Sequence, residues 1–375
     1  MTVSKSGSGL NMSRRIRRSP YTDRIEQHGV RGFSVVNHML LPKAFAPTVE
    51  EDYWHLREHV QLWDVSTQRQ VEIRGPDAAR LVQWMSPRDL RGAKVGQCLY
   101  VPLVDEWGGM INDPVLLKLA DDHFWLSIAD SDVLLWAKGL ALGAKFDVEI
   151  DEPDVSPLAV QGPKAEDLLA KLFGENIRSI GFFKFAWIEF QGTRQLMARS
   201  GFSRQGGFEI YLRGGHLGGA LWDTIWEAGR EFNITPGCPN LIERIEGGLL
   251  SYGNEFTRAD TPLECGLKDY CSLSSDLEYI GRPALEKLQA QGIRRDMRGV
   301  LFDGPPLSGV GIPLPVKSGD LHVGQITSGI WSPRLRRNVG LSMIDRDFWT
   351  PGQKVEVMLS PDDERAGEVS LLPFS

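Results

Sequence analysis

The amino-acid sequence predicts an α+β fold of more than one domain, ending in a small antiparallel β-barrel. The chain has 375 residues, which is enough for two or three domains of ordinary size. Its 40 glycines and 22 prolines indicate many turns, and therefore many short strands rather than a helical bundle. Helix-like and strand-like segments alternate up to about residue 290, and only short strand-like segments follow.

Residues 1–30 are predicted to form a mobile basic arm, because the first twenty residues are rich in arginine and serine and contain no acid. A transit peptide and a true start at Met12 are alternative interpretations of this stretch. No run of 18 apolar residues occurs, so we expect neither secretion nor a membrane span, and we predict a cytoplasmic protein.

Residues 31–293 are predicted to form an α+β region with two subdomains. Apolar residues at helical spacing predict a helix over 50–65. Alternation at 71–74 predicts a strand that ends at Gly75-Pro76, and Asp77 then begins a helix reaching about residue 85. The further elements predicted here are a hairpin of 99–103 with 115–119, a strand at 124–128 and a helix at 130–142.

The strand, Gly-Pro turn and helix recur at 158–172, where Gly162-Pro163 takes the place of Gly75-Pro76. This recurrence favours a region built from two similar halves, with a pocket where they meet. A chance similarity of two short segments is the alternative.

Residues 294–375 are predicted to form a small β-barrel or sandwich. Short strands separated by Gly and Pro, without a long helix between them, indicate this architecture. The strands are expected at 299–302, 321–327, 339–344 and 355–359.

Composition argues against several classes of function. With 42 basic and 49 acidic residues the net charge is −7, which disfavours nucleic acid and anionic membranes as partners. The four cysteines form no C-x-x-C and the seven histidines no H-E-x-x-H, so we expect no metal site. P-loop, G-x-G-x-x-G and G-x-S-x-G motifs are also missing. Carboxylates and aromatics around a small organic ligand are left as the expected chemistry.

Two glycine-rich motifs, 108–114 and 200–211, contain carboxylates with apolar neighbours, Asp113 and Glu209. A carboxylate inside a core has to be paired, hydrogen-bonded or used in function. A turn-capping Asp113 and a solvent-facing Glu209 are the structural alternatives. In a third cluster Arg244 lies between Glu243 and Glu246, where a local ion pair is the simpler explanation.

In this order and spacing, the segments resemble the glycine-cleavage T-protein (aminomethyltransferase) superfamily of tetrahydrofolate-dependent enzymes. The resemblance extends from about Trp63 to the C-terminus and implies a T-protein-like multi-domain fold. It is carried by residues 63–66, 71–78, 108–113, 201–210, 244–248, 252–254, 261–264, 279–282 and 327–329. Residues 13–22, 37–42, 52–56, 100–105, 109–114 and 126–132 are similar to the dimethylsulfoniopropionate demethylase branch of that superfamily.

The sequence departs from the aminomethyltransferases in two motifs. Their adjacent Asp-Asp is Asn112-Asp113 here, and their Gly-Tyr-Thr-Gly-Glu-Asp is Gly-Phe-Ser-Arg-Gln-Gly at 201–206. The second change removes a tyrosine hydroxyl and two acids, which disfavours aminomethyl transfer from a lipoyl carrier. Val36 stands where the demethylase branch often has an aromatic residue, so the methyl donor is less well defined than the cofactor.

The resemblance implies roles for five residues around tetrahydrofolate. Asp113 is expected to be the catalytic residue, near the reacting N5. Glu209 would accept hydrogen bonds from the pterin ring, for which a carboxylate is well suited. Tyr211 would line the same site, and Tyr100 would stack on the folate or bond to it. Arg244 would orient Glu209 or meet a folate carboxylate.

On the side of the methyl donor, Ser127 is the expected polar contact. Trp125 is the expected aromatic contact, with Trp107 and Trp187 as further candidates and plain core packing as the alternative for all three.

The function implied by the resemblance is a tetrahydrofolate-dependent demethylation of dimethylsulfoniopropionate, giving methylmercaptopropionate and 5-methyltetrahydrofolate. The alternatives are an aminomethyltransferase, a demethylase of sarcosine or glycine betaine, a folate-binding factor for iron–sulfur assembly, and a module split from a sarcosine-oxidase-like enzyme. The expected partner is a small-molecule methyl donor, and a homodimer is left open.

Overall fold

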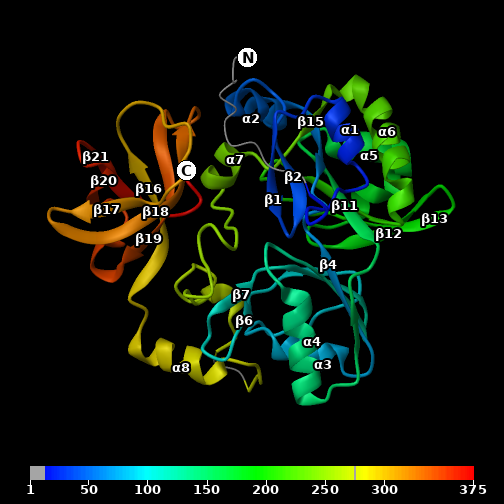
Figure 1. The fold of residues 1–375 in the computed structure, drawn as a ribbon, viewed down its shortest axis with the longest axis horizontal. Coiled ribbons are helices and arrows are strands. Elements are labelled where there is room, and N and C mark those ends of the chain that lie inside the picture. The colour runs from blue at the N-terminus through cyan, green and yellow to red at the C-terminus, as the bar shows by residue number, and fades with distance from the viewer. Residues whose placement is uncertain (1–12, 274–275) are drawn as a thin grey trace, which may run out of the picture.

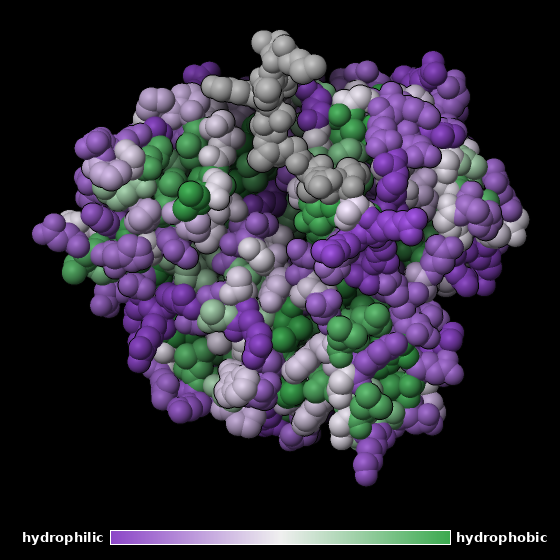
Figure 2. All heavy atoms as spheres, viewed as in Figure 1, coloured by the Kyte–Doolittle hydropathy of each residue, from purple (hydrophilic) through white to green (hydrophobic). Residues whose placement is uncertain are grey.

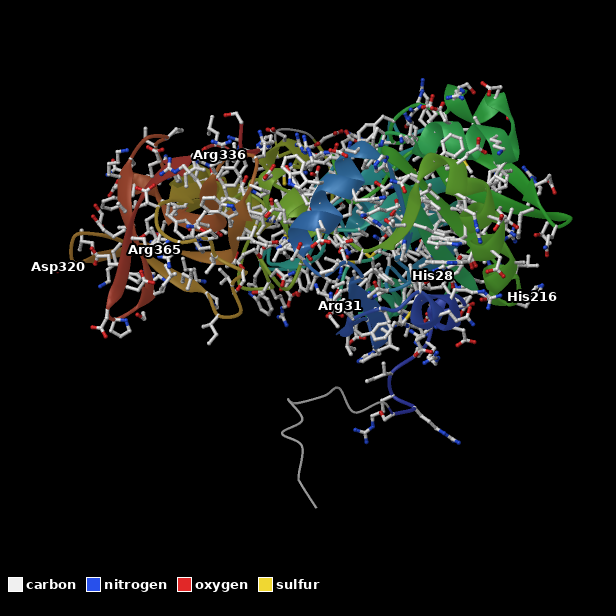
Figure 3. The ribbon with its side chains drawn as sticks, turned by 90° about the horizontal axis from the view of Figure 1, so that it is seen from above. His28, Arg31, His216, Asp320, Arg336 and Arg365 are labelled. Carbon is white, nitrogen blue, oxygen red and sulfur yellow. The ribbon has the colours of Figure 1, made fainter. Side chains whose placement is uncertain are left out.

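The computed structural model describes residues 13–273 and 276–375 of the chain. Two β-sheets with helices form one side of the molecule, and a closed β-barrel forms the other (Figure 1). Seen from above, the barrel with Asp320 and Arg365 lies at one end, and His28 and His216 lie at the opposite end (Figure 3). The α+β architecture and the C-terminal antiparallel barrel are therefore confirmed.

The five-stranded sheet has the order β10-β4-β9-β8-β5. Its apolar face packs on α3 and α4 through Ile73, Leu116 and Leu126. The bounds are β4 Gln70–Arg74, β5 Cys98–Tyr100, β8 Val115–Ala120, β9 His123–Ser127, β10 Glu149–Asp151, α3 Ala78–Trp84 and α4 Val133–Ala144.

The six-stranded sheet has the order β12-β13-β14-β11-β3-β15. One face packs on α1, α5 and α6 through Phe208, Ile210 and Leu212. The bounds are β3 Val60–Asp64, β11 Val155–Gln161, β12 Phe185–Phe190, β13 Thr193–Ala198, β14 Gly207–Arg213, β15 Ile234–Gly237, α1 Thr22–Gln27, α5 Ala165–Phe173 and α6 Gly218–Gly229.

The two sheets repeat one topology. In chain order β4, α3, β5, β8, β9 and α4 correspond to β11, α5, β12, β13, β14 and α6, and the spatial orders β4-β9-β8-β5 and β11-β14-β13-β12 also agree. Gly75 and Gly162 begin the equivalent turns with φ of 125° and 118°. A Cβ at Gly162 would lie 2.3 Å from a backbone oxygen, so both the conformation and the space require glycine. The internal repeat predicted from the sequence is confirmed.

The faces of the two sheets that carry no helices pack against each other. Cys98, Leu117 and Trp125 of the five-stranded sheet contact Leu196 and Tyr211 of the six-stranded sheet in one buried cluster. Because side chains alternate along a strand, Glu209 and Tyr211 point between the sheets while their neighbours point to the helices. Any polar side chain on these two faces is therefore buried between the five-stranded and the six-stranded sheet.

The barrel is closed in the order β16-β19-β18-β17-β20-β21. Its interior is filled by apolar residues such as Val300, Phe302 and Ile326. The bounds are β16 Arg295–Phe302, β17 Leu314–Ser318, β18 Leu321–Ser332, β19 Arg337–Asp345, β20 Lys354–Ser360 and β21 Asp363–Ser370. β17 and β21 were not among the four predicted strands, because only Val316 and Val369 in them are both apolar and buried.

The remaining elements connect these parts. Helix α7 packs on β18 and β19 of the barrel, and α8 precedes the barrel in the chain. The bounds are β1 Gly32–Val36, β2 Met39–Ala44, α2 Val49–Glu58, β6 Leu103–Val104, β7 Met110–Asn112, α7 Leu241–Glu246 and α8 Arg282–Gln291, with 3-10 helices at Glu175–Ser179, Gly215–Leu217, Arg230–Phe232, Lys268–Tyr270 and Arg346–Phe348.

Two N-terminal predictions differ from the structure. The helix expected over 50–65 ends at Glu58, and β3 follows with every residue buried, so β3 has no alternation that would mark it as a strand. Within the predicted mobile arm, Tyr21 and Ile25 are fully buried against Trp222 in the core of the six-stranded sheet. Two apolar residues one helical turn apart anchor this segment despite its basic neighbours. Residues 1–12 of the arm lie outside the described residues.

On the face shown in Figure 2, apolar side chains are interspersed with polar ones. No helix in the described part of the chain has the length and apolar character needed to cross a membrane.

Candidate functional site

Asp113 lies between β7 and β8, beside the edge where β8 pairs with β5. Because Tyr100 of β5 pairs with Val115, its hydroxyl reaches Asp113 and donates to Oδ2 at 2.7 Å. The other oxygen, Oδ1, is buried and makes no hydrogen bond of good geometry among the described residues, although the Tyr252 backbone N–H lies near the carboxylate. Burial raises the pKa of Asp113 to about 7; the charge of Glu255 adds to this rise, whereas the bond from Tyr100 opposes it. Asp113 is thus suited to exchange a proton near neutral pH.

Glu209 lies in the middle of β14 and is 3% exposed. Its cross-strand neighbours are Ala159 of β11 and Ala198 of β13, two small side chains that leave its carboxylate unobstructed. Ser200 donates a hydrogen bond to Oε2 at 2.5 Å. Burial raises the pKa of Glu209, and the hydrogen bonds from Ser200 and Gln68 oppose that rise. The solvent-facing alternative for Glu209 is wrong.

Ser127 ends β9 and pairs with Gln70, the first residue of β4. Gln70 donates to the Ser127 hydroxyl at 3.0 Å, and the hydroxyl donates to Gln68 Oε1 at 3.3 Å. The carbonyl oxygen of the Gln70 side chain is buried without a partner among the described residues. Because Gln68 also contacts Glu209, Ser127 belongs to the same polar region as Glu209.

Tyr211 and Trp125 face each other between the sheets, with ring centroids 6.4 Å apart. The Tyr211 hydroxyl lies near Ser127 and Ser200 but makes no hydrogen bond of good geometry, and burial raises its pKa. The Trp125 indole N–H donates to Glu72 at 2.9 Å, and the side chain is almost fully buried. Its N–H is therefore already used within the protein, and only its ring remains for a ligand contact.

Strand β5 connects the surroundings of the two carboxylates. Cys98 and Tyr100 are two residues apart, so they lie on one face of β5, roughly 7 Å from each other. Cys98 lies beside Glu209, whose charge adds to the burial that raises the pKa of the thiol, and Tyr100 bonds to Asp113. The two glycine-rich motifs are therefore linked through one face of β5. We call this group the inter-sheet polar cluster, formed by Tyr100, Asp113, Ser127, Glu209 and Tyr211.

Arg244 is placed differently from its expected role. On α7 its guanidinium donates to Glu255 at 2.7 Å and to Ser328 of the barrel at 2.6 Å, and no hydrogen bond to Glu209 is found among the described residues. Helix α7 packs on β18, and the buried carboxylate of Glu255 holds the Arg244 side chain against the barrel. The expectation that Arg244 orients Glu209 is therefore wrong, and a contact with a folate carboxylate stays a prediction.

Sequence reasoning missed three members of this region, Gln68, Gln70 and Ser200. Gln68 lies two residues before β4, Gln70 is the first residue of β4, and Ser200 follows the end of β13 at the start of the 200–211 motif. Nothing local in the sequence marks these three side chains as ligand contacts. Only the pairing of β4 with β9, and of β13 with β14, brings them to Ser127 and Glu209.

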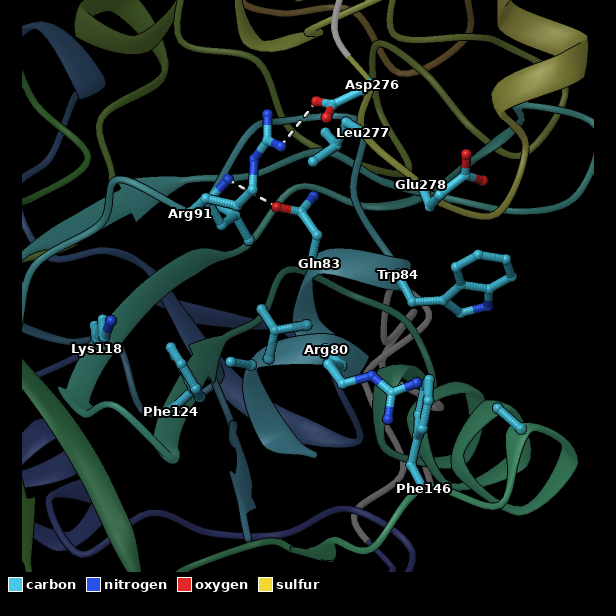
Figure 4. A pocket seen from close by; sticks show the side chains of 14 residues that line it. Arg80, Gln83, Trp84, Arg91, Lys118, Phe124, Phe146, Asp276, Leu277 and Glu278 are labelled. Carbon is cyan, nitrogen blue, oxygen red and sulfur yellow. Dashed lines mark hydrogen bonds and ion pairs between the residues drawn. The ribbon is translucent and has the colours of Figure 1, made fainter. Parts of the chain in front are cut away.

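A cavity of about 580 Å³ lies elsewhere, on the side of α3 that carries Arg80 and Gln83 (Figure 4). Arg80 stacks on Phe146 at 4.8 Å, and Arg91 pairs with Asp276 at 2.8 Å at its rim. None of the predicted site residues lines it. In the described part of the chain, no three His, Cys, Asp or Glu side chains gather closely enough to hold a metal ion.

Family models match nearly the whole chain. The GCVT N-terminal domain matches residues 21–275, and the glycine cleavage T-protein C-terminal barrel domain matches residues 298–375. The chain belongs to the glycine-cleavage T-protein family.

Two individual relatives and one solved structure match this chain over most of the length of both chains. Dimethylsulfoniopropionate demethylase DmdA of Ruegeria pomeroyi is 50% identical over 94% of this chain and 96% of its own. An aminomethyltransferase of Thermoanaerobacter sp. is 30% identical over 85% of this chain and 87% of its own. The crystal structure of the glycine cleavage system aminomethyltransferase T from Bartonella henselae has the same fold, with a TM-score of 0.86, 23% identity, and 96% and 98% of the two chains covered.

Proposed function

We propose that this protein demethylates dimethylsulfoniopropionate onto tetrahydrofolate, giving methylmercaptopropionate and 5-methyltetrahydrofolate. Its family makes it a tetrahydrofolate-dependent one-carbon transferase. The observation that carries the choice of substrate is the 50% identity, over nearly the full length of both chains, to a protein named for this reaction. The buried, partly unpartnered carboxylate of Asp113 supports the same choice, because a desolvated carboxylate attracts a sulfonium cation.

The inter-sheet polar cluster fits a folate ring. Asp113 Oδ1, the Gln70 side-chain oxygen and the Tyr211 hydroxyl are buried without partners among the described residues, and an unsatisfied buried polar atom is costly unless a ligand completes it. Glu209 and Gln70 offer acceptors for the donors of a pterin edge. Tyr211 and Tyr100 would complete the same site.

When bound, tetrahydrofolate supplies the ring nitrogen that accepts the methyl group. The protein supplies position and charge. Residues fixed on strands of both sheets can hold two reactants in line, which in favourable cases is worth about 7–11 kcal/mol of the barrier. Asp113, held through Oδ2 by Tyr100, stabilises positive charge between the sheets and can take up a proton at Oδ1.

Turnover tests the substrate directly. The purified protein is incubated with tetrahydrofolate and, separately, dimethylsulfoniopropionate, sarcosine or glycine betaine. We expect methylmercaptopropionate and 5-methyltetrahydrofolate from the sulfonium only. Turnover of a different donor, with none of the sulfonium, would refute the assignment.

Binding tests the role of Glu209. Replacing Glu209 by Gln removes a charged acceptor, so tetrahydrofolate binding should weaken roughly 10–100-fold in calorimetry, from the ~1.5–3 kcal/mol of a charge-assisted bond. Glu189, the one exposed residue of β12, is the control, and Glu189→Gln should bind normally. Equal binding by Glu209→Gln and the wild type would contradict the proposed cofactor site.

Aminomethyl transfer is the second candidate, supported by aminomethyltransferase relatives at 30–33% identity. It predicts activity with an aminomethyl-lipoyl carrier protein, which the altered 201–206 turn disfavours. We also propose a cytoplasmic location and leave a homodimer as a prediction, which light scattering would test.

A further inference from the structure

Asn112, the residue before Asp113, is fully buried, and its side-chain amide both donates and accepts a hydrogen bond. Its Nδ2 donates to the Ser131 hydroxyl at 2.8 Å, and its Oδ1 accepts from the Ala129 backbone N–H at 3.0 Å. The single proton of the Ser131 hydroxyl goes to the carbonyl of Ile111 at 2.9 Å. With its proton used in this way, the Ser131 oxygen can only accept from position 112. An amide there supplies that donor and also accepts from Ala129, which an ionised carboxylate cannot do.

A second buried amide continues this network. Asn37 Nδ2 donates to the carbonyls of Thr67 at 2.8 Å and Ala129 at 2.9 Å, and its Oδ1 accepts from the Ser131 N–H at 3.2 Å. Asn37 and His38 have φ of 51° and 60° and form the tip of the β1–β2 hairpin. Such angles are uncommon outside glycine, and Asn tolerates them best, so this tip is shaped for its contacts.

The network connects three parts of the candidate site. Asn112 precedes Asp113, residues 129–131 follow the strand that ends at Ser127, and Thr67 precedes Gln68. The two amides thus tie the turn that carries Asp113 to the two loops on either side of Ser127. A displacement of residues 129–131 would move Asp113 and the Ser127–Gln68 side of the inter-sheet polar cluster relative to each other.

We propose that Asn112 is a positioning residue for methyl transfer, which acts through Ser131, Ala129 and Asn37 to set Asp113 against the Ser127–Gln68 side of the site. This inference rests on the proposed function. An ionised aspartate at 112 has no proton to donate, so Ser131 would keep either its bond to Ile111 or a bond to position 112 but not both, and a second negative charge would lie beside Asp113.

Three variants separate the effect of losing the Asn112–Ser131 contact from the effect of adding a charge beside Asp113. Asn112→Asp removes the donor and adds charge. Ser131→Ala removes the bonds of the hydroxyl to Asn112 and to Ile111 without adding charge, and Ser131→Thr keeps the hydroxyl. We expect kcat to fall about tenfold in the first two, equivalent to about 1.4 kcal/mol, and to stay within threefold of wild type in the third. The dissociation constant of tetrahydrofolate should change less than twofold. Only Asn112→Asp should also move the kcat–pH midpoint upward.

Asn338 in the barrel provides a matched control, since it is fully buried, donates to three carbonyls at 303–305 and accepts from Leu307. Asn338→Asp should lower the melting temperature and leave kcat and its pH dependence unchanged. Hydrogen exchange should accelerate at 129–131 only in Asn112→Asp and Ser131→Ala.

The outcomes distinguish the two proposals. Wild-type turnover with each donor tests the proposed function alone, and the variants are then compared on whichever donor the wild type uses. Faster exchange at 129–131 with unchanged kcat would overturn the inference and leave Asn112 a structural residue. Unchanged exchange in both variants would overturn it as well.

Discussion

Replacing Asp113 by Asn is expected to stabilise the protein, and to do so more at pH 8 than at pH 5. Burial raises the pKa of this carboxyl from 3.8 to about 7, a shift of about 3 units. Each unit corresponds to about 1.36 kcal/mol, so ionised Asp113 costs the folded state about 4 kcal/mol above pH 7.

The sign follows from proton binding. Between about pH 4 and pH 7 the folded state keeps a proton on Asp113 that the unfolded state has lost, so wild-type stability falls as the pH rises through this window. Asparagine does not titrate. The advantage of Asp113→Asn should therefore be about 0.5 kcal/mol near pH 4, about 1.5 kcal/mol at pH 5 and about 4 kcal/mol at pH 8.

Urea unfolding followed by tryptophan fluorescence at pH 5 and pH 8 measures this difference. Asp296→Asn is the control, because Asp296 is also buried but pairs with Arg298 at 2.8 Å, and its replacement should destabilise the protein at both pH values. A stability difference between Asp113→Asn and wild type that does not grow with pH would refute the assignment of a buried, strained charge. The variant should also lose most of its methyl-transfer activity, since it cannot take up a proton.

Three further predictions concern the surroundings of the site. Tyr100→Phe removes the 2.7 Å bond that holds the pKa of Asp113 down, so the midpoint of the kcat–pH profile should move upward by about one unit; an unchanged midpoint would show that Asp113 does not control it. Glu255→Ala leaves the buried guanidinium of Arg244 without its acid and should cost about 3–5 kcal/mol in urea unfolding, whereas a solvated Arg244 would make the change nearly neutral. Gly162→Ala should lower the melting temperature by several degrees, because a Cβ there would lie 2.3 Å from the carbonyl oxygen at the end of α2; alanine at an open surface glycine should not.

Much of the fold follows from patterns local in the sequence. The Gly-Pro turns at Gly75 and Gly162 mark both copies of the repeat, since a strand that turns sharply into a helix needs a positive φ at that position. β3 escaped detection because it is buried on both faces and shows no alternation. β17 and β21 escaped because each contains a single buried apolar side chain, Val316 and Val369.

The sequence by itself determined most of the elements, the internal repeat, the family and both carboxylates, because these depend on neighbouring residues and on motifs in a fixed order. Tertiary structure alone decided what surrounds them. It paired Arg244 with Glu255, added Gln68, Gln70 and Ser200, and left one oxygen of Asp113 without a partner. The physical reason is that hydrogen-bond partners and pKa values depend on burial and on segments far apart in the chain, which strand pairing brings within 3 Å.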